Sequence, residues 1–154
     1  TGFTIAHSIT LSLATMNLVK VRTELIELLI ALSIVLLARE IIFARKNKLE
    51  PPLSIKFPIS ISAFFGLLHG FGFAVVLQEL GLPFDMKINA LLFFNIGVEI
   101  GQLFFIGIVL LIAILLRSSP LFSNTYLPFI NQLGIYFIGT LSTFWFLQRT
   151  FALI

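Results

Sequence analysis

The sequence predicts an all-α membrane protein: a polytopic bundle of about five membrane helices, in a single domain over residues 1–154. Three observations predict this fold class. Apolar residues make up 58% of the chain and charged residues 11%, whereas soluble domains carry roughly a quarter charged residues. The apolar residues form long runs, as membrane-spanning helices require. Short polar stretches that contain proline and basic residues separate these runs, as loops between spans do.

The first apolar segment, residues 2–16, is shorter than the ~20 residues that a helix needs to cross the hydrocarbon layer. The chain also begins abruptly in apolar sequence, at a threonine. We therefore expect a helix that lacks its start, and a further helix upstream that is missing from this chain. The four later segments are long enough to span the membrane, and they comprise residues 23–44, 58–80, 88–116 and 126–148.

The basic residues of the connecting loops predict the orientation of the helices. With alternating spans, the loops 45–56 and 117–125 lie on one side of the membrane. That side carries Arg45, Lys46, Lys48, Lys56 and Arg117, and the opposite side carries Lys20, Arg22, Lys87 and Arg149. The positive-inside rule makes the first side cytoplasmic. The small net charge of +3 and the clustering of basic residues in loops indicate control of topology, so no nucleic-acid partner is expected.

Three titratable side chains, His7, His69 and Glu99, lie inside apolar segments. Ionisable groups are expensive in hydrocarbon, and in membrane proteins they usually face the bundle interior or a wet cavity. Each of the three comes from a different predicted helix, so we expect them to meet in one buried polar cluster. Further polar side chains support this cluster by helical spacing, and they are Ser8, Asn95 and Gln102.

Two glycine pairs at a four-residue spacing predict close helix packing. Gly66 and Gly70 share a helix face with His69 in the third segment, and Gly97 and Gly101 lie on roughly the opposite face from Glu99 in the fourth. Small residues at this spacing let two membrane helices approach closely. We expect both pairs to lie against neighbouring helices.

The expected polar cluster suits a divalent transition metal ion. Imidazole and carboxylate groups together bind nickel, zinc, copper or iron, and nickel or zinc is the ion that we expect. The same groups could relay protons, because histidine titrates near neutral pH. The chain has no cysteine, which excludes a thiolate metal site, a cysteine nucleophile and disulfide bonds.

Four motifs, read in order, resemble the HupE/UreJ family of membrane proteins, in particular its second subgroup. The family's FTxAHSxTL motif resembles GFTIAHSITLSLA at residues 2–14, and its FGxxHGFGFA motif resembles FGLLHGFGFA at 65–74. Its FNxGVExGQ motif is similar to FNIGVEIGQL at 94–103, and the ending of its last helix to FWFLQR at 144–149. The resemblance covers nearly the whole chain. It implies a polytopic protein of a bacterial-type inner membrane with hydrogenase or urease accessory functions, whose relatives include nickel permeases.

The chain differs in two places from the permease branch of the family that it resembles. That branch carries a second histidine after its first HG pair, at the position where this chain has Phe73. It also carries a His-Asp-His element on an early helix, and no such element occurs in this sequence. The resemblance to the family therefore implies metal transport, whereas the metal ligands of the permease branch are only partly present in this sequence.

Three functional hypotheses follow. The motifs favour a permease for a divalent transition metal, with His7, His69 and Glu99 at its metal site. The second hypothesis is an intramembrane metal-dependent enzyme, a hydrolase or an acyl-transfer enzyme, in which the same residues act as ligands and acid–base groups. Of the two, we favour the permease, so we expect that the protein is not an enzyme. The third is a structural subunit of a larger membrane complex. The expected partners are the lipid bilayer and other membrane chains, in a homo-oligomer or a larger complex.

Overall fold

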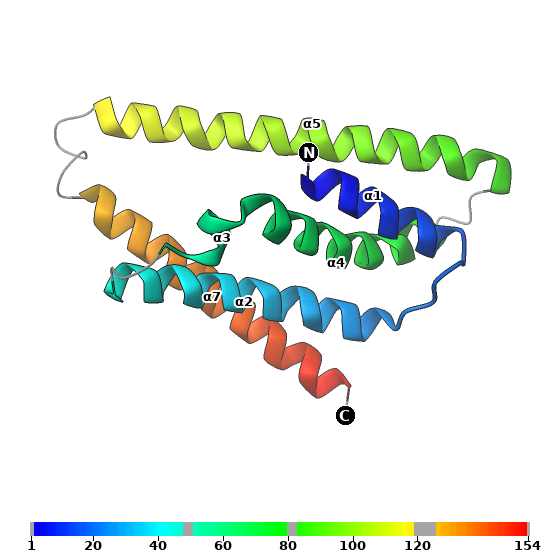
Figure 1. Cartoon of the computed structure of the whole chain (residues 1–154), viewed down its shortest axis with the longest axis horizontal. Helices are drawn as coiled ribbons and strands as arrows, with labels where there is room; N and C mark the ends of the chain where they lie inside the picture. Colours follow the sequence, from blue (N-terminus) through cyan, green and yellow to red (C-terminus); the bar gives the residue numbers. More distant parts are fainter. Residues whose placement is uncertain (1, 48–50, 80–82, 119–125, 154) are drawn as a thin grey trace.

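The computed structural model describes residues 2–47, 51–79, 83–118 and 126–153, and every regular element in these ranges is a helix (Figure 1). The helices are α1 Gly2–Thr15, α2 Thr23–Asn47, α3 Leu53–Lys56, α4 Pro58–Glu79, α5 Phe84–Ser118 and α7 Tyr126–Ala152. The predicted all-α class is therefore confirmed. The five long helices correspond to the five predicted apolar segments, and several of them extend a few residues beyond the predicted ends.

α1 and α4 pack along each other at the centre of the bundle and run in the same direction (Figure 1). α5 lies along α1 in the opposite direction. Thr4 of α1 contacts Glu99 of α5, and His7, one turn later on α1, contacts Asn95, one turn earlier on α5. α2 packs on α4, and α7 crosses α2, in each case with opposite direction (Figure 1). The long helices thus alternate in direction along the chain, which is compatible with alternating membrane spans.

Two glycines of α4 let α1 and α4 touch backbone to backbone. A methyl group added at Gly66 would lie under 3.0 Å from the carbonyl oxygen of Phe3. A methyl group at Gly70 would lie under 3.0 Å from the carbonyl oxygen of His7 and from the hydroxyl of Thr10. Real side chains essentially never make such contacts, so glycine is required at both positions. This close approach leaves the side chain of His7 fully buried.

α1 ends in a Schellman motif that turns the chain toward α2. Asn17 has a left-handed backbone conformation (φ 58°), which asparagine adopts more readily than most residues. The N–H of Leu18 donates to the carbonyl of Leu13 at 2.9 Å, and the N–H of Asn17 donates to that of Ala14 at 3.0 Å. These two bonds satisfy carbonyl groups that the end of a helix otherwise leaves free.

The predicted cytoplasmic loop 45–56 contains a short helix that the sequence did not predict. The carboxylate of Glu40 on α2 accepts hydrogen bonds from the backbone N–H groups of Leu53 and Ser54, the latter at 3.4 Å. A carboxylate in this position satisfies the free N–H groups at a helix start, so α3 forms beside α2. Residues 48–50 of this loop, and most of the predicted loop 117–125, lie outside the described residues.

The predicted number of membrane spans is supported only in part by helix length and composition. Among the described residues, one helix is both long and apolar enough to cross a membrane, Met86–Ser118 within α5. The stretch Pro58–Ala74 of α4 is apolar but shorter. α2 and α7 reach the length of a span but contain several charged or amide side chains, and α1 has 14 residues.

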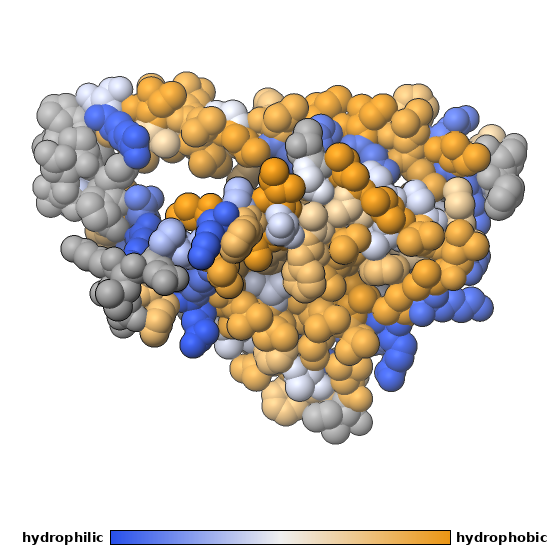
Figure 2. Space-filling model, viewed as in Figure 1, coloured by the Kyte–Doolittle hydropathy of each residue, from blue (hydrophilic) through white to orange (hydrophobic). Residues whose placement is uncertain are grey.

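The surface of the bundle is apolar over much of its extent. Figure 2 shows apolar residues over most of the viewed face, with many of the hydrophilic residues toward its left and right ends. None of the most apolar stretch of α5 is buried inside the chain. Soluble monomers rarely expose contiguous apolar patches of this kind.

An ion pair joins α7 to the first turns of α2. Nε of Arg149 lies 3.1 Å from Oε2 of Glu27, and both side chains are partly buried. We expect Glu27→Gln and Arg149→Gln each to lower the melting temperature of the detergent-solubilised protein by a few degrees, because each leaves a partly buried charge without its partner. The charge-swapped double variant, Glu27→Arg with Arg149→Glu, is expected to recover most of the loss in the same thermal-unfolding measurement.

The pair of Arg22 and Glu24 provides the matched control. These two groups are 3.9 Å apart and both side chains are mostly exposed, and exposed pairs contribute about 0–1 kcal/mol. Glu24→Gln is therefore expected to leave the melting temperature unchanged. A loss in Glu24→Gln as large as that in Glu27→Gln would contradict a specific role for the ion pair between α2 and α7.

Candidate metal site between α1, α4 and α5

His7 of α1 is fully buried and has one free ring nitrogen. Its Nδ1 lies 3.2 Å from Oδ1 of Asn95 on α5. The side-chain amide of Asn95 donates from Nδ2 to the carbonyl of Leu91 at 2.8 Å, which fixes Oδ1 as the atom that faces His7. Since Oδ1 only accepts, Nδ1 of His7 carries the proton and Nε2 carries the lone pair. Nε2 is buried and has no hydrogen-bond partner among the described residues.

His69 of α4 has the same arrangement of protons. Its Nδ1 lies 2.8 Å from the carbonyl oxygen of Phe65, one turn earlier on the same helix. A carbonyl oxygen only accepts, so Nδ1 donates and Nε2 is the unprotonated nitrogen of the neutral ring. The side chain of His69 is partly buried.

Glu99 of α5 accepts a hydrogen bond from the hydroxyl of Thr4 on α1. Thr4 lies one turn before His7, and Glu99 lies one turn after Asn95, so the two antiparallel helices are joined by two polar contacts one above the other. The carboxylate therefore lies about one helical turn from the contact between the imidazole of His7 and the amide of Asn95.

Aromatic rings surround the imidazole of His7. Phe3 and Phe94 lie nearly parallel to it, with ring centroids at 5.7 and 6.0 Å, and Phe73 meets it edge to face at 5.8 Å. Phe3 also meets the ring of His69, at 5.5 Å. These rings leave few polar groups around Nε2 of His7, and their electron-rich faces attract cations.

The structure brings the predicted site residues only partly together. His7 and His69 contact the same phenylalanine ring, and Asn95 supports His7 as a hydrogen-bond acceptor. Over the described residues, no three side chains of the metal-binding types His, Asp and Glu come close enough to hold an ion. His7, His69 and Glu99 thus do not form a ready three-ligand site, and the ring of Phe3 on α1 lies against both imidazoles.

Two of the predicted supporting residues lie differently from expectation. Ser8 donates its hydroxyl to the carbonyl of Thr4 at 2.6 Å, within its own helix. Gln102 is partly buried on α5, one turn beyond Glu99, and its side chain makes no hydrogen bond to another described residue. Thr4 donates its hydroxyl to Glu99, and it was not among the predicted site residues although it lies one turn from His7.

The two glycine pairs also differ from each other. Gly66 and Gly70 lie against the backbone of α1, as expected. Gly97 and Gly101 face open space, since an added methyl group would meet nothing within 4 Å among the described residues. The prediction that this second pair packs against another helix is therefore wrong within the described chain, because Asn95 and Glu99 turn the polar face of α5 toward α1 and the glycines lie on another face.

Sequence reasoning missed the aromatic residues of the site. Phe3 and Phe94 were not distinguished from the other phenylalanines, of which the chain contains 18, and Phe73 was noted only as the residue in place of a second histidine. The available signal was their spacing: Phe3 lies one turn before His7, Phe73 lies one turn after His69, and Phe94 precedes Asn95. Residues at these positions share or adjoin the face of the polar group.

Comparisons with known proteins agree with the motifs. The family model described as HupE / UreJ protein matches residues 1–149. A search of the curated proteins and a search of the solved structures each found no match. The family match includes α1, α4 and α5 in full, with both histidines, Asn95 and Glu99. The chain belongs to the HupE/UreJ family.

Proposed function

We propose that the chain forms part of a membrane permease for a divalent transition metal of the nickel type, and that the ion meets His7, His69 and Glu99 on its way. Proteins of the HupE/UreJ family are membrane-associated and are linked to nickel or cobalt accessory and permease functions. The observation that carries the proposal is the hydrogen bonding of the two imidazoles. In each, Nδ1 lies against an accepting oxygen, so that in a neutral ring Nε2 is the nitrogen with the lone pair.

Metal-binding histidines commonly have this arrangement. A hydrogen bond from one ring nitrogen fixes the tautomer and makes the other nitrogen a stronger ligand. A buried nitrogen without a hydrogen bond costs about 1–3 kcal/mol of stability, and native proteins leave few such groups. Nε2 of His7 is a group of this kind. Its role as a ligand for the transported ion explains why the chain keeps it.

The arrangement suits an ion that passes through the site. Transport needs ligands that bind strongly enough to admit an ion and weakly enough to release it. Two imidazoles that contact a common ring, with a carboxylate about one turn away, offer successive ligands in place of one strong site. We infer that the ion is passed between the two Nε2 atoms and that the charge of Glu99 offsets part of its positive charge.

The proposal places the five long helices in a bacterial-type inner membrane, which α2, α4, α5 and α7 cross and which α1, with 14 residues, enters without crossing. The alternating helix directions and the apolar outer surface support this arrangement (Figures 1 and 2). The loops that follow α2 and α5 then lie on the same side of the membrane, and the predicted orientation makes that side cytoplasmic. Lipid covers the exposed apolar surface of α5.

We expect His7→Ala, His69→Ala and Glu99→Gln each to lower nickel uptake at least about 10-fold, since removal of groups at a metal site typically lowers affinity or activity by 10- to 100-fold. The measurement is uptake of radioactive nickel into cells that express the protein, normalised to the amount of the protein in the membrane fraction. Ser8→Ala is the matched control, because the Ser8 hydroxyl bonds to a carbonyl of its own helix. Wild-type uptake in all three site variants, or an equal loss in Ser8→Ala, would contradict the proposal.

A structural subunit of a larger membrane complex is the second candidate, and the uncovered apolar surface of α5 favours it. In that case the polar contacts between α1 and α5 would serve only to lock the helices together. The protein purified in mild detergent would then remain with other membrane chains, and metal uptake would not respond to His69→Ala.

A further inference from the structure

The crossing of α2 and α7 creates a second site, separate from the polar site of α1, α4 and α5. The helices are in tight contact at Ala38 and Gly139, where a methyl group added at Gly139 would lie 3.3 Å from the Cβ of Ala38. Because the helices cross at an angle, they diverge on either side of their contact (Figure 1). Toward the C-terminal end of α2 they border a half-open cavity of about 140 Å³.

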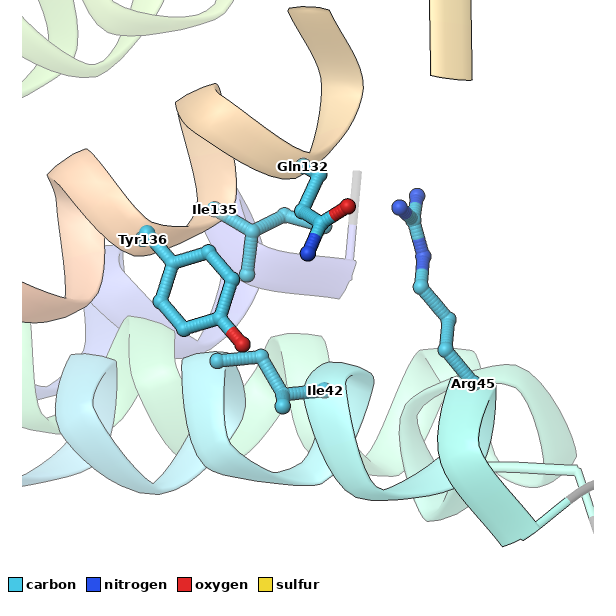
Figure 3. Close-up of a pocket in the computed structure, with 5 residues that line it drawn as sticks. All are labelled: Ile42, Arg45, Gln132, Ile135 and Tyr136. Atoms are coloured by element: carbon cyan, nitrogen blue, oxygen red, sulfur yellow. The ribbon is translucent and has the colours of Figure 1, made fainter. Parts of the chain in front are cut away.

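This cavity has a cationic, donor-rich end. Its walls are Ile42, Arg45, Gln132, Ile135 and Tyr136. Figure 3 shows the guanidinium of Arg45 on α2 and the side-chain amide of Gln132 on α7 extending toward the same open space from opposite helices. Both groups have N–H donors, and arginine is permanently charged. None of the described residues that line the cavity is acidic, so its charge favours an anion.

An apolar groove adjoins the cavity at Ile42 and Tyr136, which line both spaces. The groove has a volume of about 470 Å³ and follows the seam of α2 and α7 past Ala38 and Gly139 toward Leu147. Apolar side chains line much of it, and Arg39, Thr140 and Thr143 lie among them. Together the cavity and the groove form an amphiphilic site in which two arginines, Arg45 and Arg39, lie beside apolar side chains.

We propose that this seam binds an anionic phospholipid, with its phosphate at Arg45 and Gln132 and an acyl chain in the adjoining groove. Arg45 lies in the last turn of α2, where arginine side chains reach the level of the headgroups. Tyrosine, present here as Tyr136, is enriched at the same depth. The loop after Arg45 is the one predicted to be cytoplasmic, and basic residues on that side attract the anionic lipids of the inner leaflet. The inference does not depend on metal transport.

The bound lipid would act as a structural partner of α7. In the described chain α7 packs mainly on α2, so a lipid in the seam touches both helices and holds them together. A ligand that binds only the folded protein stabilises it. We therefore expect anionic lipid to raise the melting temperature of the purified protein, and we expect this increase to depend on Arg45.

Native mass spectrometry tests the proposal on the whole protein, purified in detergent and incubated with equal amounts of phosphatidylglycerol and phosphatidylcholine. The wild-type protein is expected to retain phosphatidylglycerol over phosphatidylcholine by roughly tenfold, because both lipids carry a phosphate but the choline ammonium of phosphatidylcholine cancels its net charge and repels the guanidinium of Arg45. Arg45→Gln is expected to lose most of this preference. Gln132→Trp, at an exposed position, fills the cavity while Arg45 stays, and it is expected to lower retention of both lipids.

Arg117→Gln is the matched control, because Arg117 is exposed at the end of α5, is predicted to lie on the same side of the membrane, and does not line the cavity. It is expected to keep the wild-type preference. An equal loss of the lipid preference in Arg45→Gln and Arg117→Gln would show general attraction of anionic lipid to surface charge and would contradict a specific site. Absence of a preference in the wild-type protein, or equally effective competition by inorganic phosphate, would also overturn the proposal.

Discussion

Gly70→Ala is expected to prevent α1 from docking on α4 and to remove most of the folded protein. The added methyl group would lie under 3.0 Å from the carbonyl oxygen of His7 and from the hydroxyl of Thr10. A carbonyl oxygen in the middle of a helix cannot move away without moving the helix. Overpacking of a close-packed contact typically costs 1–3 kcal/mol. Because the clash here is with backbone, we expect Gly70→Ala to lower the free energy of unfolding by about 3 kcal/mol or more.

The measurement is the yield of monodisperse protein in size-exclusion chromatography together with its thermal unfolding in detergent. Gly97→Ala and Gly101→Ala are the matched controls, since a methyl group at either position meets nothing within 4 Å among the described residues. Alanine favours a helix over glycine by about 1 kcal/mol, so the controls are expected to fold at least as well as the wild-type protein. Unfolding of Gly70→Ala at the wild-type temperature would contradict the close backbone contact between α1 and α4.

The double variant His7→Leu with Asn95→Leu is expected to separate folding from function. It removes the buried Nε2 that has no partner and both members of the hydrogen bond between α1 and α5. Replacing both partners of a buried hydrogen bond by apolar groups is often nearly neutral or stabilising. We therefore expect a melting temperature equal to or above that of the wild-type protein, and metal uptake reduced at least about 10-fold.

The single variants complete a thermodynamic cycle for this pair. His7→Leu leaves Oδ1 of Asn95 without its donor, and Asn95→Leu leaves Nδ1–H of His7 without its acceptor. Each single variant is therefore expected to be less stable than the double variant by about 1–3 kcal/mol. Wild-type uptake in a stably folded double variant would assign His7 a purely structural role and would end the metal-site proposal.

The number and the order of the long helices could be predicted from the sequence. Apolar runs and the short polar breaks between them are local properties, and each run corresponds to one of the long helices. α3 could not be predicted in this way, because it depends on Glu40, which lies 13 residues before Leu53 in the sequence and accepts its N–H. A cap supplied by another helix leaves no local signal in the segment that it caps.

Sequence reasoning named the histidines, Asn95 and Glu99 of the candidate site, but it missed Thr4 and did not give the contacts. Helical spacing placed Asn95 and Glu99 on one face, and the structure turns that face toward α1. The same reasoning treated the two glycine pairs alike, although only Gly66 and Gly70 meet a backbone. The difference arises because α5 turns its polar face toward α1, so its glycine face lies elsewhere.

What the sequence determined by itself is the helical class, the apolar segments that become the long helices, and the few polar groups that those segments contain. These follow from composition and from a periodicity of 3.6 residues, which any stretch of chain carries within itself. Only the tertiary structure decided that Nε2 of His7 is the free nitrogen, that Phe3 touches both imidazoles, and that Thr4 pairs with Glu99. Each of these depends on the distance and rotation between helices, which packing of the whole bundle sets and which no single segment encodes.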